Sequence, residues 1–288
     1  MKFSEAVASY EEQCWKKYIP KETVMAFLVE IAQRERYDLY AHFDEEMPED
    51  LYEEFSTGME RILQNEPMAH VLGYSWFYGY KMITNENVLI PRYETEELCA
   101  QILSRIDLYF PKEIPLECVD VGTGCGAIAI TLKKEEPRLV MSASDISKEA
   151  LEVAKENAKI NEANITFVEG DMLEPIKALN KKFDVLVCNP PYIPENEKME
   201  SSVIDFEPHV ALFGGKDGLY YYEKVFKGCL EVLKEKSMMA FEMGWNQKRA
   251  MEKLLKEYLP QADYEVVKDI NGKNRMLFVY LGIDKNGV

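Results

Sequence analysis

The sequence predicts an α/β protein in which a mostly parallel sheet with helices on both faces follows a small helical domain. Segments typical of strands and of helices alternate from about residue 116 to the end of the chain. Before residue 70 the apolar side chains recur mainly at helical spacing. The chain has 288 residues, 47% of them hydrophobic and 30% charged, which is typical of a folded globular protein with one large or two modest domains.

Residues 1–69 are predicted to form a helical domain of three to five helices. Apolar side chains stand three or four positions apart within residues 22–43, and the same spacing recurs after residue 50. Pro20, Pro48 and Pro67 separate these stretches. Proline starts or breaks helices because it has no amide hydrogen, so these positions mark the expected helix boundaries.

Residues 70–91 change in character and are predicted to be a β-hairpin connector. Five aromatic residues lie between Tyr74 and Tyr80, and Gly79 stands among them. Aromatic enrichment interrupted by glycine is typical of short paired strands. The larger domain is then expected to occupy residues 92–288.

The larger domain is predicted to contain one sheet of mostly parallel strands. Alternating strands and helices produce parallel strands, because each helix carries the chain back across the sheet. Asn271-Gly272 is a preferred turn sequence of tight hairpins and joins the last two strand-like segments, so one strand is expected to run antiparallel. The expected strands are 116–121, 139–143, 165–168, 183–188, 238–243, 264–268 and 275–280, and the expected helices are 127–134, 148–161, 219–233 and 247–258.

The charge of the chain is strongly acidic, with a net value of −17. This charge argues against a free-standing nucleic-acid-binding protein, whose affinity comes mainly from Lys and Arg on phosphates. The stretch Asp44–Glu54 contains seven acids and no base. It is either a solvated face or a docking surface for a basic partner.

Several further classes of protein are not favoured. No run of 18 apolar residues predicts a transmembrane helix, and the acidic N-terminal stretch does not resemble a signal peptide, so a cytoplasmic protein without membrane association is expected. The six cysteines are scattered without a CxxC pair, and the chain has only three histidines. Neither a disulfide framework nor a metal site is therefore expected.

The first candidate site is the glycine-rich turn Asp120-Val-Gly122-Thr123-Gly124-Cys125-Gly126, which follows a predicted strand and opens a predicted helix. Glycine adopts positive φ and lets a ligand approach the backbone, and such turns bind nucleotides in doubly wound folds. The spacing is GxGxG, whereas dinucleotide-binding proteins have GxGxxG and P-loop proteins have GxxxxGK[ST]. Neither NAD nor ATP is favoured.

Acidic residues follow the next two strands. Asp145 ends the second strand, where a carboxylate can accept both hydroxyls of an adenosine ribose. Asp171 follows the third strand, within reach of an adenine amino group, and Met172 can pack on the ring. Because the carboxyl ends of parallel strands share one edge, these residues and the glycine turn are expected to face one crevice.

The most specific feature is Asn189-Pro190-Pro191-Tyr192, directly after the fourth strand. The prolines restrict the backbone and remove two N–H donors, and Tyr192 offers an aromatic face. The Asn189 oxygen and the Pro190 carbonyl can each accept one hydrogen from a planar NH₂ group. The motif therefore predicts a site for an amide or an exocyclic amino group.

Together, these motifs resemble those of S-adenosylmethionine-dependent amino-methyltransferases. Further segments narrow the resemblance to the bacterial peptide chain release factor glutamine N(5)-methyltransferases, the HemK/PrmC family, and it covers essentially the whole chain. Tyr93, where the family usually has proline, and Met172, where some members have an aromatic residue, depart from the pattern. The segments that carry the narrower resemblance are Asn65–Gly73, Leu89–Glu96, Phe206–Leu212, Glu242–Trp245 and the terminal hairpin.

The resemblance implies a class I methyltransferase sheet of Rossmann type and a role for each motif. It implies methyl transfer from S-adenosylmethionine, without a metal, to the side-chain amide nitrogen of the glutamine in the Gly-Gly-Gln motif of class-1 release factors, with S-adenosylhomocysteine as the product. Asn189, Pro190 and Tyr192 would be catalytic, and these residues with Pro191 would bind the substrate. The cofactor would be bound by Asp120, Gly122, Thr123, Gly124, Cys125, Gly126, Asp145, Asp171, Met172 and Asn189.

An alternative function uses the same crevice. An amino-methyltransferase acting on adenine or guanine of nucleic acid would need the same acceptors and would stack its flipped base on Tyr192. The net charge of −17 and the lack of a basic, aromatic-rich arm oppose this alternative. The residues around Arg92, Glu94 and Thr95 are equally consistent with a helix cap and with a place in the site.

Overall fold

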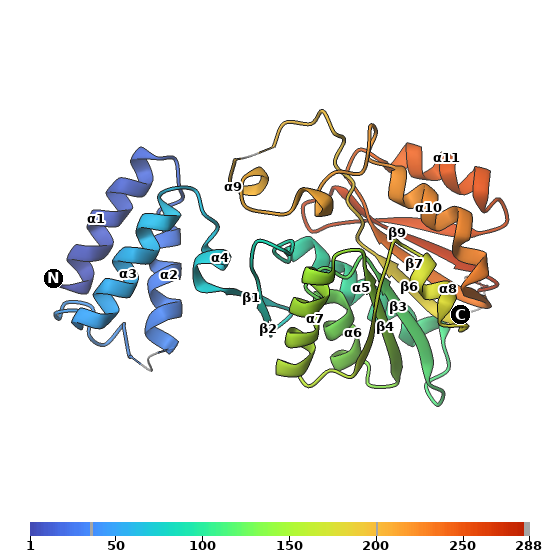
Figure 1. Cartoon of the computed structure of the whole chain (residues 1–288), viewed down its shortest axis with the longest axis horizontal. Helices are drawn as coiled ribbons and strands as arrows, with labels where there is room; N and C mark the ends of the chain where they lie inside the picture. The colour runs from blue at the N-terminus through green and yellow to red at the C-terminus, as the bar shows by residue number, and fades with distance from the viewer. Residues whose placement is uncertain (35–36, 200, 285–288) are drawn as a thin grey trace. The chain divides into compact units, whose positions relative to one another are not determined.

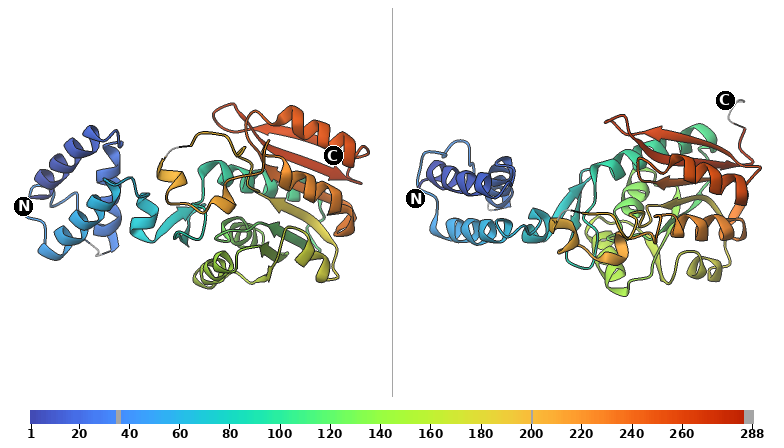
Figure 2. Two further views of the ribbon diagram at one scale, coloured as in Figure 1. Left: turned by 45° about the horizontal axis from the view of Figure 1, so that its top comes forward. Right: turned by 90° about the horizontal axis from the view of Figure 1, so that it is seen from above.

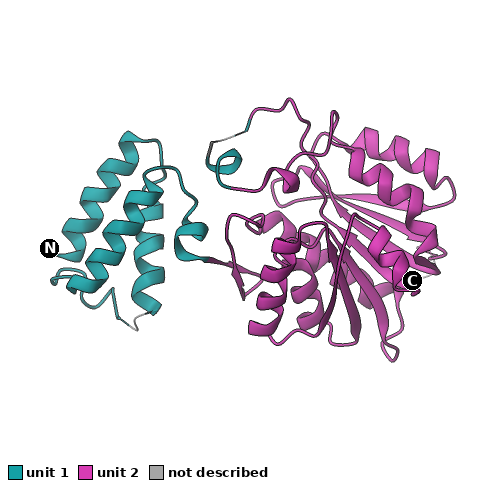
Figure 3. Ribbon diagram, viewed as in Figure 1, with its two compact units in different colours: residues 1–73, 199–206 teal, residues 74–198, 207–288 magenta. Residues whose placement is uncertain are grey.

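The computed structural model describes residues 1–34, 37–199 and 201–284 of the chain. Its residues form two compact units, one of Met1–Gly73 with Met199–Phe206 and one of Tyr74–Lys198 with Glu207–Val288 (Figure 3). The hairpin predicted as a connector lies in the second unit. The predicted division into residues 1–69, 70–91 and 92–288 stays a prediction.

The first unit is helical. Pro48 and Pro67 each stand directly before a helix, in agreement with the expected punctuation. Phe3, Phe27 and Phe55 are almost completely buried in its core. Its helices are α1 (Phe3–Lys16), α2 (Glu22–Arg34), α3 (Glu49–Ile62), α4 (Met68–Leu72) and the short α9 (Ser201–Ile204).

The second unit is built on a seven-stranded sheet (Figure 1). Its order is β5-β4-β3-β6-β7-β9-β8, and β3 to β7 are mutually parallel. β9 runs antiparallel to both of its neighbours, which confirms the predicted sheet with one antiparallel strand. The strands are β3 (Leu116–Val121), β4 (Leu139–Asp145), β5 (Ile165–Glu169), β6 (Phe183–Cys188), β7 (Leu233–Glu242), β8 (Asp263–Lys268) and β9 (Asn274–Leu281).

Helices cover both faces of the sheet, as the two buried clusters on either side show (Figures 1 and 2). Val119 and Val121 of β3 point into one cluster, and Leu116 and Cys118 into the other, because side chains alternate along a strand. One face carries α5 (Tyr93–Tyr109), α6 (Ala127–Glu135) and α7 (Lys148–Ile160). The other carries α8 (Glu174–Ala178), α10 (Tyr220–Gly228) and α11 (Lys248–Tyr258).

A two-stranded hairpin, β1 (Tyr74–Phe77) and β2 (Tyr80–Ile83), packs on the first of these faces. The buried Asn157 of α7 anchors it, donating from Nδ2 to the Ile83 carbonyl at 3.1 Å and accepting from the Ile83 amide at 2.6 Å. The following Val88–Pro91 segment is not part of a strand.

The strand order creates a switch point beside β3. The chain moves outward from β3 to β4 and β5, then returns to the other side of β3 for β6 and β7. The loops after β3 and β6 therefore leave in opposite directions and open a crevice at the carboxyl ends of the strands. Within the described residues, no helix is both long and apolar enough to cross a membrane.

Candidate active site

The turn after β3 is held open by three glycines. Gly122, Gly124 and Gly126 have φ of 76°, 54° and 86°, values that other residues adopt only with strain. A Cβ at Gly122 or Gly124 would meet no atom within 4 Å, whereas one at Gly126 would lie 3.2 Å from the Cβ of Ala154. Gly126 thus allows α7 to approach closely, while the other two leave bare backbone beside open space.

Asp120 lies behind this turn and is fully buried. Its Oδ2 accepts the hydroxyl hydrogen of Thr123 at 2.6 Å. Burial raises the pKa of Asp120 to about 7, an effect that the Thr123 hydrogen bond opposes and the nearby Asp145 reinforces. Thr123 lines the cleft described below and Asp120 does not. Asp120 therefore braces the turn from beneath.

Asp145 ends β4 and faces the turn. Its Oδ2 accepts from the Gly124 amide at 2.8 Å, and its Oδ1 accepts from the Ser147 amide at 2.9 Å. Burial raises the pKa of Asp145, while these backbone amides lower it. Each carboxylate oxygen keeps a second lone pair, so the group can still accept two hydroxyl hydrogens from a ligand.

Asp171 and Met172 follow β5 and also line the cleft. Lys224 of α10 forms an ion pair with Asp171. Burial lowers the pKa of Lys224, but the Asp171 carboxylate raises it by more than burial lowers it. The pKa of Lys224 is therefore raised, and the ammonium form is favoured. Met172 is buried and has a φ of 50° in the turn that follows β5.

These residues line one cleft at the carboxyl edge of the sheet. The glycine turn, Asp145 and Met172 all line it. Residues from three further segments complete the wall, and all are in the sheet unit. They are Asn87, Val88, Leu89, Pro91, Arg92 and Thr95 before and within α5; Asn189 and Pro191 after β6; and Pro208, Val210, Ala211 and Tyr221 from the region before and within α10.

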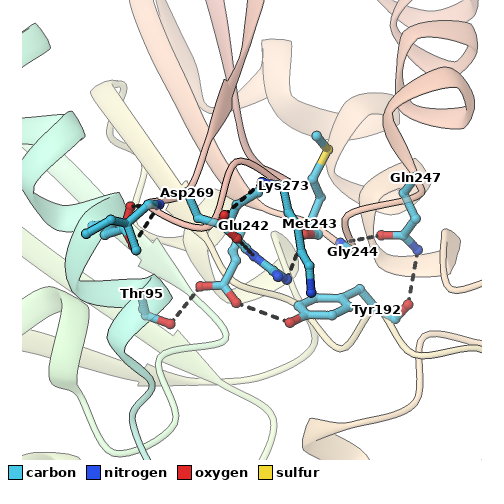
Figure 4. A network of polar contacts seen from close by, with 11 residues as sticks. Thr95, Tyr192, Glu242, Met243, Gly244, Gln247, Asp269 and Lys273 are labelled. Atoms are coloured by element: carbon cyan, nitrogen blue, oxygen red, sulfur yellow. Dashed lines mark hydrogen bonds and ion pairs between the residues drawn. The ribbon is translucent and has the colours of Figure 1, made fainter.

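The Asn189–Tyr192 motif closes the cleft beside β3. Asn189 is half-buried, lines the cleft and donates from Nδ2 to Thr95 Oγ1 at 3.3 Å. Pro191 also lines the cleft, whereas Pro190 is buried and, like Tyr192, is not among the lining residues. Tyr192 instead donates its hydroxyl hydrogen to Glu242 Oε1 at 3.2 Å (Figure 4). Burial, with the Glu242 carboxylate nearby, raises the pKa of Tyr192.

The backbone of this motif is fixed by two distant segments. The Ile193 amide donates to the Leu212 carbonyl at 3.1 Å, and the Ile193 carbonyl accepts from the Gly214 amide at 2.9 Å. Gln247 Nε2 donates to the Tyr192 carbonyl at 3.0 Å, as Figure 4 shows. The turn that carries Asn189 is therefore supported from both sides.

The structure also brings in residues whose role the sequence left open or did not indicate. Glu207 is buried, accepts from the Ile90 amide at 3.0 Å and pairs with Arg92. Thr95 donates to Glu242 Oε2 at 2.6 Å, and α5 has no side-chain hydrogen bond at its N-cap. Thr95 therefore has a place in the site. These hydrogen bonds and the ion pair join residues more than 100 positions apart. No local sequence motif could therefore predict them.

The arrangement has definite chemical capacities. Open backbone at Gly122 and Gly124, carboxylate acceptors at Asp145 and an apolar side chain at Met172 fit a ligand with a ribose diol and a planar ring. A carbonyl oxygen on Asn189 fits a polarised N–H donor beside it. Among the residues that the structure describes, no group of three or more His, Cys, Asp or Glu side chains is placed to hold a metal ion.

Comparison with known proteins gives matches over most of the chain. The family model described as the methyltransferase small domain matches residues 106–206, and the one described as the PrmC N-terminal domain matches residues 8–73. A protein of Bacillus cereus named release factor glutamine methyltransferase is 42% identical over 253 residues, which cover 87% of this chain and 89% of that protein. A Bacillus subtilis protein of the same name is 42% identical over 245 residues, which cover 84% of this chain and 85% of that protein.

Solved structures agree on the fold. A methyltransferase from Pyrococcus furiosus superposes with a TM-score of 0.52 at 17% sequence identity, covering 78% of this chain and 98% of that one. At this identity the likeness extends to the fold alone, and it matches the predicted methyltransferase sheet.

Proposed function

This chain belongs to the release factor glutamine methyltransferase family, and from that premise we propose that the cleft at the ends of β3 and β6 is its active site. The enzyme transfers a methyl group to a glutamine of release factors, the reaction named for its relatives. The proposal for the site depends above all on one observation: Asn189 lines the same cleft as the glycine turn and Asp145. An acceptor for the substrate amide and a site that fits a nucleoside therefore lie in the same cleft.

The methyl donor in this proposal is S-adenosylmethionine. Gly122 and Gly124 would admit its methionine and ribose part beside their bare backbone. Asp145 would accept the ribose hydroxyls, and Met172 would pack at the adenine with Asp171 near the amino group. When bound, this cofactor supplies an electrophilic methyl group on a sulfonium sulfur.

The acceptor in this proposal is the glutamine of the Gly-Gly-Gln motif of class-1 release factors. Asn189 Oδ1 would accept one hydrogen of the glutamine amide, and the Pro190 carbonyl would accept the other. Pro191 and Tyr192 would shape the surrounding turn. Two acceptors draw the amide nitrogen out of conjugation and stabilise the positive charge that develops on it.

Positioning would account for most of the rate enhancement. An amide nitrogen is a poor nucleophile because its lone pair is delocalised, so it must be aligned with the methyl carbon and sulfur. Favourable alignment lowers a barrier by roughly 7–11 kcal/mol. One preorganised polar group such as Asn189 typically contributes about 3–4 kcal/mol more.

The proposed setting follows from the substrate. Release factors act in the cytoplasm, so we place the enzyme there, away from membranes. The acidic charge of −17 would favour encounter with a basic face of the partner, through rate and orientation. Methylation of adenine or guanine in nucleic acid is not favoured, because the full-length relatives are named for a protein substrate.

The test is labelled methyl transfer from S-adenosylmethionine to three acceptors in parallel. These are a purified unmethylated release factor, the same factor with its Gly-Gly-Gln changed to Gly-Gly-Ala, and total RNA with DNA. We expect label on the unchanged factor alone. Label on the alanine variant would contradict the choice of glutamine, and label on nucleic acid alone would contradict the proposed substrate.

A further inference from the structure

A fully buried carboxylate lies behind the proposed substrate site. Glu242 is the last residue of β7 and is 2% exposed. Its neighbour Phe241 pairs with Cys188, so Glu242 lies alongside Asn189 at the end of β6. A buried charge is costly unless it is hydrogen-bonded, and the proposed mechanism makes no use of it.

Two hydroxyl groups satisfy this carboxylate (Figure 4). Thr95 of α5 donates to Oε2 at 2.6 Å, and Tyr192 donates to Oε1 at 3.2 Å. Thr95, a residue that is 5% exposed, also accepts from Asn189 Nδ2 through its hydroxyl oxygen at 3.3 Å. Asn189, Thr95 and Glu242 therefore form one chain of hydrogen bonds from the cleft into the interior.

The chemistry of these groups gives that chain one direction. Burial raises the pKa of Glu242, while the hydrogen bond from Thr95, the nearby Arg275 and the hydrogen bond from Tyr192 oppose that rise. In its ionised form this carboxylate has no hydrogen to donate, so the single hydroxyl hydrogen of Thr95 is used on Glu242. The Thr95 oxygen can then only accept, and the Asn189 group facing it must be the NH₂. The Asn189 carbonyl oxygen is consequently directed away from Thr95.

This direction matters because an asparagine amide can turn. Its terminal torsion has two broad wells, in which the oxygen and nitrogen exchange places. In the turned state an N–H of Asn189 would face the N–H of the substrate amide. The two groups would repel, and the acceptor would be lost.

We propose that Thr95 and Glu242 are positioning residues that hold the Asn189 carbonyl oxygen toward the substrate amide. The inference rests on the proposed function, in which that oxygen accepts a hydrogen of the glutamine side chain. Neither Thr95 nor Glu242 touches the reacting atoms, so both act through Asn189.

The test is a mutant cycle measured with a purified unmethylated release factor and labelled S-adenosylmethionine. Thr95→Val keeps the shape of threonine but removes the acceptor, whereas Thr95→Ser keeps the hydroxyl. We expect Thr95→Val to lower kcat about tenfold or more and Thr95→Ser to restore most of it. Glu242→Gln should also lower kcat, because its amide can donate to Thr95 and reverse the chain.

The cycle separates positioning from general support of the structure. When Thr95→Val is added to Asn189→Ala, we expect no further loss, since Thr95 acts only through Asn189. Cofactor affinity by calorimetry should stay within about twofold of the parent in Thr95→Val and Glu242→Gln, because Thr95 and Glu242 orient only the substrate acceptor. Matched controls are Thr131→Val, whose fully buried hydroxyl has no hydrogen-bond partner among the described residues, and Asp184→Asn, a buried carboxylate at the opposite end of β6.

Each other outcome counts against a specific claim. Full activity of Thr95→Val and Glu242→Gln beside an impaired Asn189→Ala would overturn the positioning role and leave the role of Asn189 intact. Full activity of Asn189→Ala would overturn the proposed function of that residue as well. Additive losses in the double variant, or loss of cofactor binding in both single variants, would show that the network supports the whole cleft and would also overturn the inference.

Discussion

At the scale of single residues, Asp145 carries two tasks with one carboxylate. It holds the Gly124 and Ser147 amides, and in the proposed complex it accepts the ribose hydroxyls. Asp145→Ala removes both tasks, so we expect the dissociation constant of S-adenosylmethionine to rise roughly 10- to 100-fold, as measured by calorimetry. Asp184→Ala removes a buried carboxylate that also accepts a backbone amide, and it should leave the constant unchanged. A constant within about twofold of the parent in Asp145→Ala would contradict the assignment.

Asp120 should make stability depend on pH. Its pKa is about 7 in the folded chain against an ordinary value of 3.8, so the folded state holds a proton that the unfolded state loses. Stability is therefore highest below the lower value and falls as the pH rises through the folded pKa. Asp120→Asn keeps an acceptor for Thr123 and removes the titration. Its melting temperature relative to the parent should be several degrees higher at about pH 8 than at about pH 5. An equal difference at both pH values would contradict the raised pKa.

Single residues also show how far the sequence could predict the site. The sequence indicated Asn189 and Asp145 because Asn189 directly follows one buried strand and Asp145 ends another, and the ends of parallel strands meet at one edge. Thr95 and Glu242 are 147 positions apart, and neither belongs to a motif whose spacing indicates a hydrogen bond. The orientation of Tyr192 was equally inaccessible, because its hydroxyl turns toward Glu242, a partner that only the sheet register brings near.

At the scale of elements, the segment before α10 holds the Asn189–Tyr192 turn in place. Gly218 has a φ of 74°, and a Cβ there would lie 2.1 Å from the Tyr192 carbonyl oxygen and 2.7 Å from Gln247 Nε2. The Tyr192 backbone and the Gln247 side chain, which are hydrogen-bonded to each other, would both have to move to make room for this Cβ. Only glycine fits, so the spacing of these loops depends on this residue.

Gly218→Ala should therefore displace the turn that carries Asn189. We expect kcat/KM for the release factor to fall by about tenfold or more, because small displacements of a reacting group are costly. Gly79→Ala is the matched control: its φ is 80°, but a Cβ there meets nothing within 4 Å. It should cost about 1–2 kcal/mol of stability and leave kcat/KM nearly unchanged. Similar activities of the two variants would rule out the collision as the cause.

The bounds of helices and strands were predictable where the apolar residues show a strong pattern. They were less predictable where tertiary packing determines the end of an element. The buried strands β3 and β6 have the predicted bounds. β7 begins at Leu233, five residues earlier than predicted. The prediction missed this part of the strand because Lys234 to Lys236 are exposed and show no alternation of apolar and polar residues. The predicted helix 219–233 ends as an α-helix at Gly228 and continues only as a 3₁₀ turn over Cys229–Glu231. A glycine such as Gly228 lowers the stability of a helix, but its position in the sequence does not predict at which residue the helix ends.

At the scale of the whole molecule, charge is the feature that bears on partner recognition. The chain carries −17, and the seven acids of Asp44–Glu54 are all exposed while Met47 and Leu51 are buried beneath them. The structure thus presents these carboxylates to solvent on the helical unit. A face of one sign speeds encounter with a partner of the opposite sign, and salt weakens the effect.

Reversing part of this charge tests whether its place matters as well as its amount. We expect the quadruple variant Glu45→Lys, Glu46→Lys, Glu49→Lys and Glu53→Lys to lower kcat/KM for the release factor about tenfold at low salt, with kcat unchanged. The control reverses Glu113, Glu235, Glu257 and Asp263, exposed acids of the sheet unit that do not line the cleft, and it changes the net charge equally. An equal loss in both variants would assign the effect to net charge alone. An unchanged kcat/KM in the first variant would remove Asp44–Glu54 as a docking surface, because steering by these residues requires their sign.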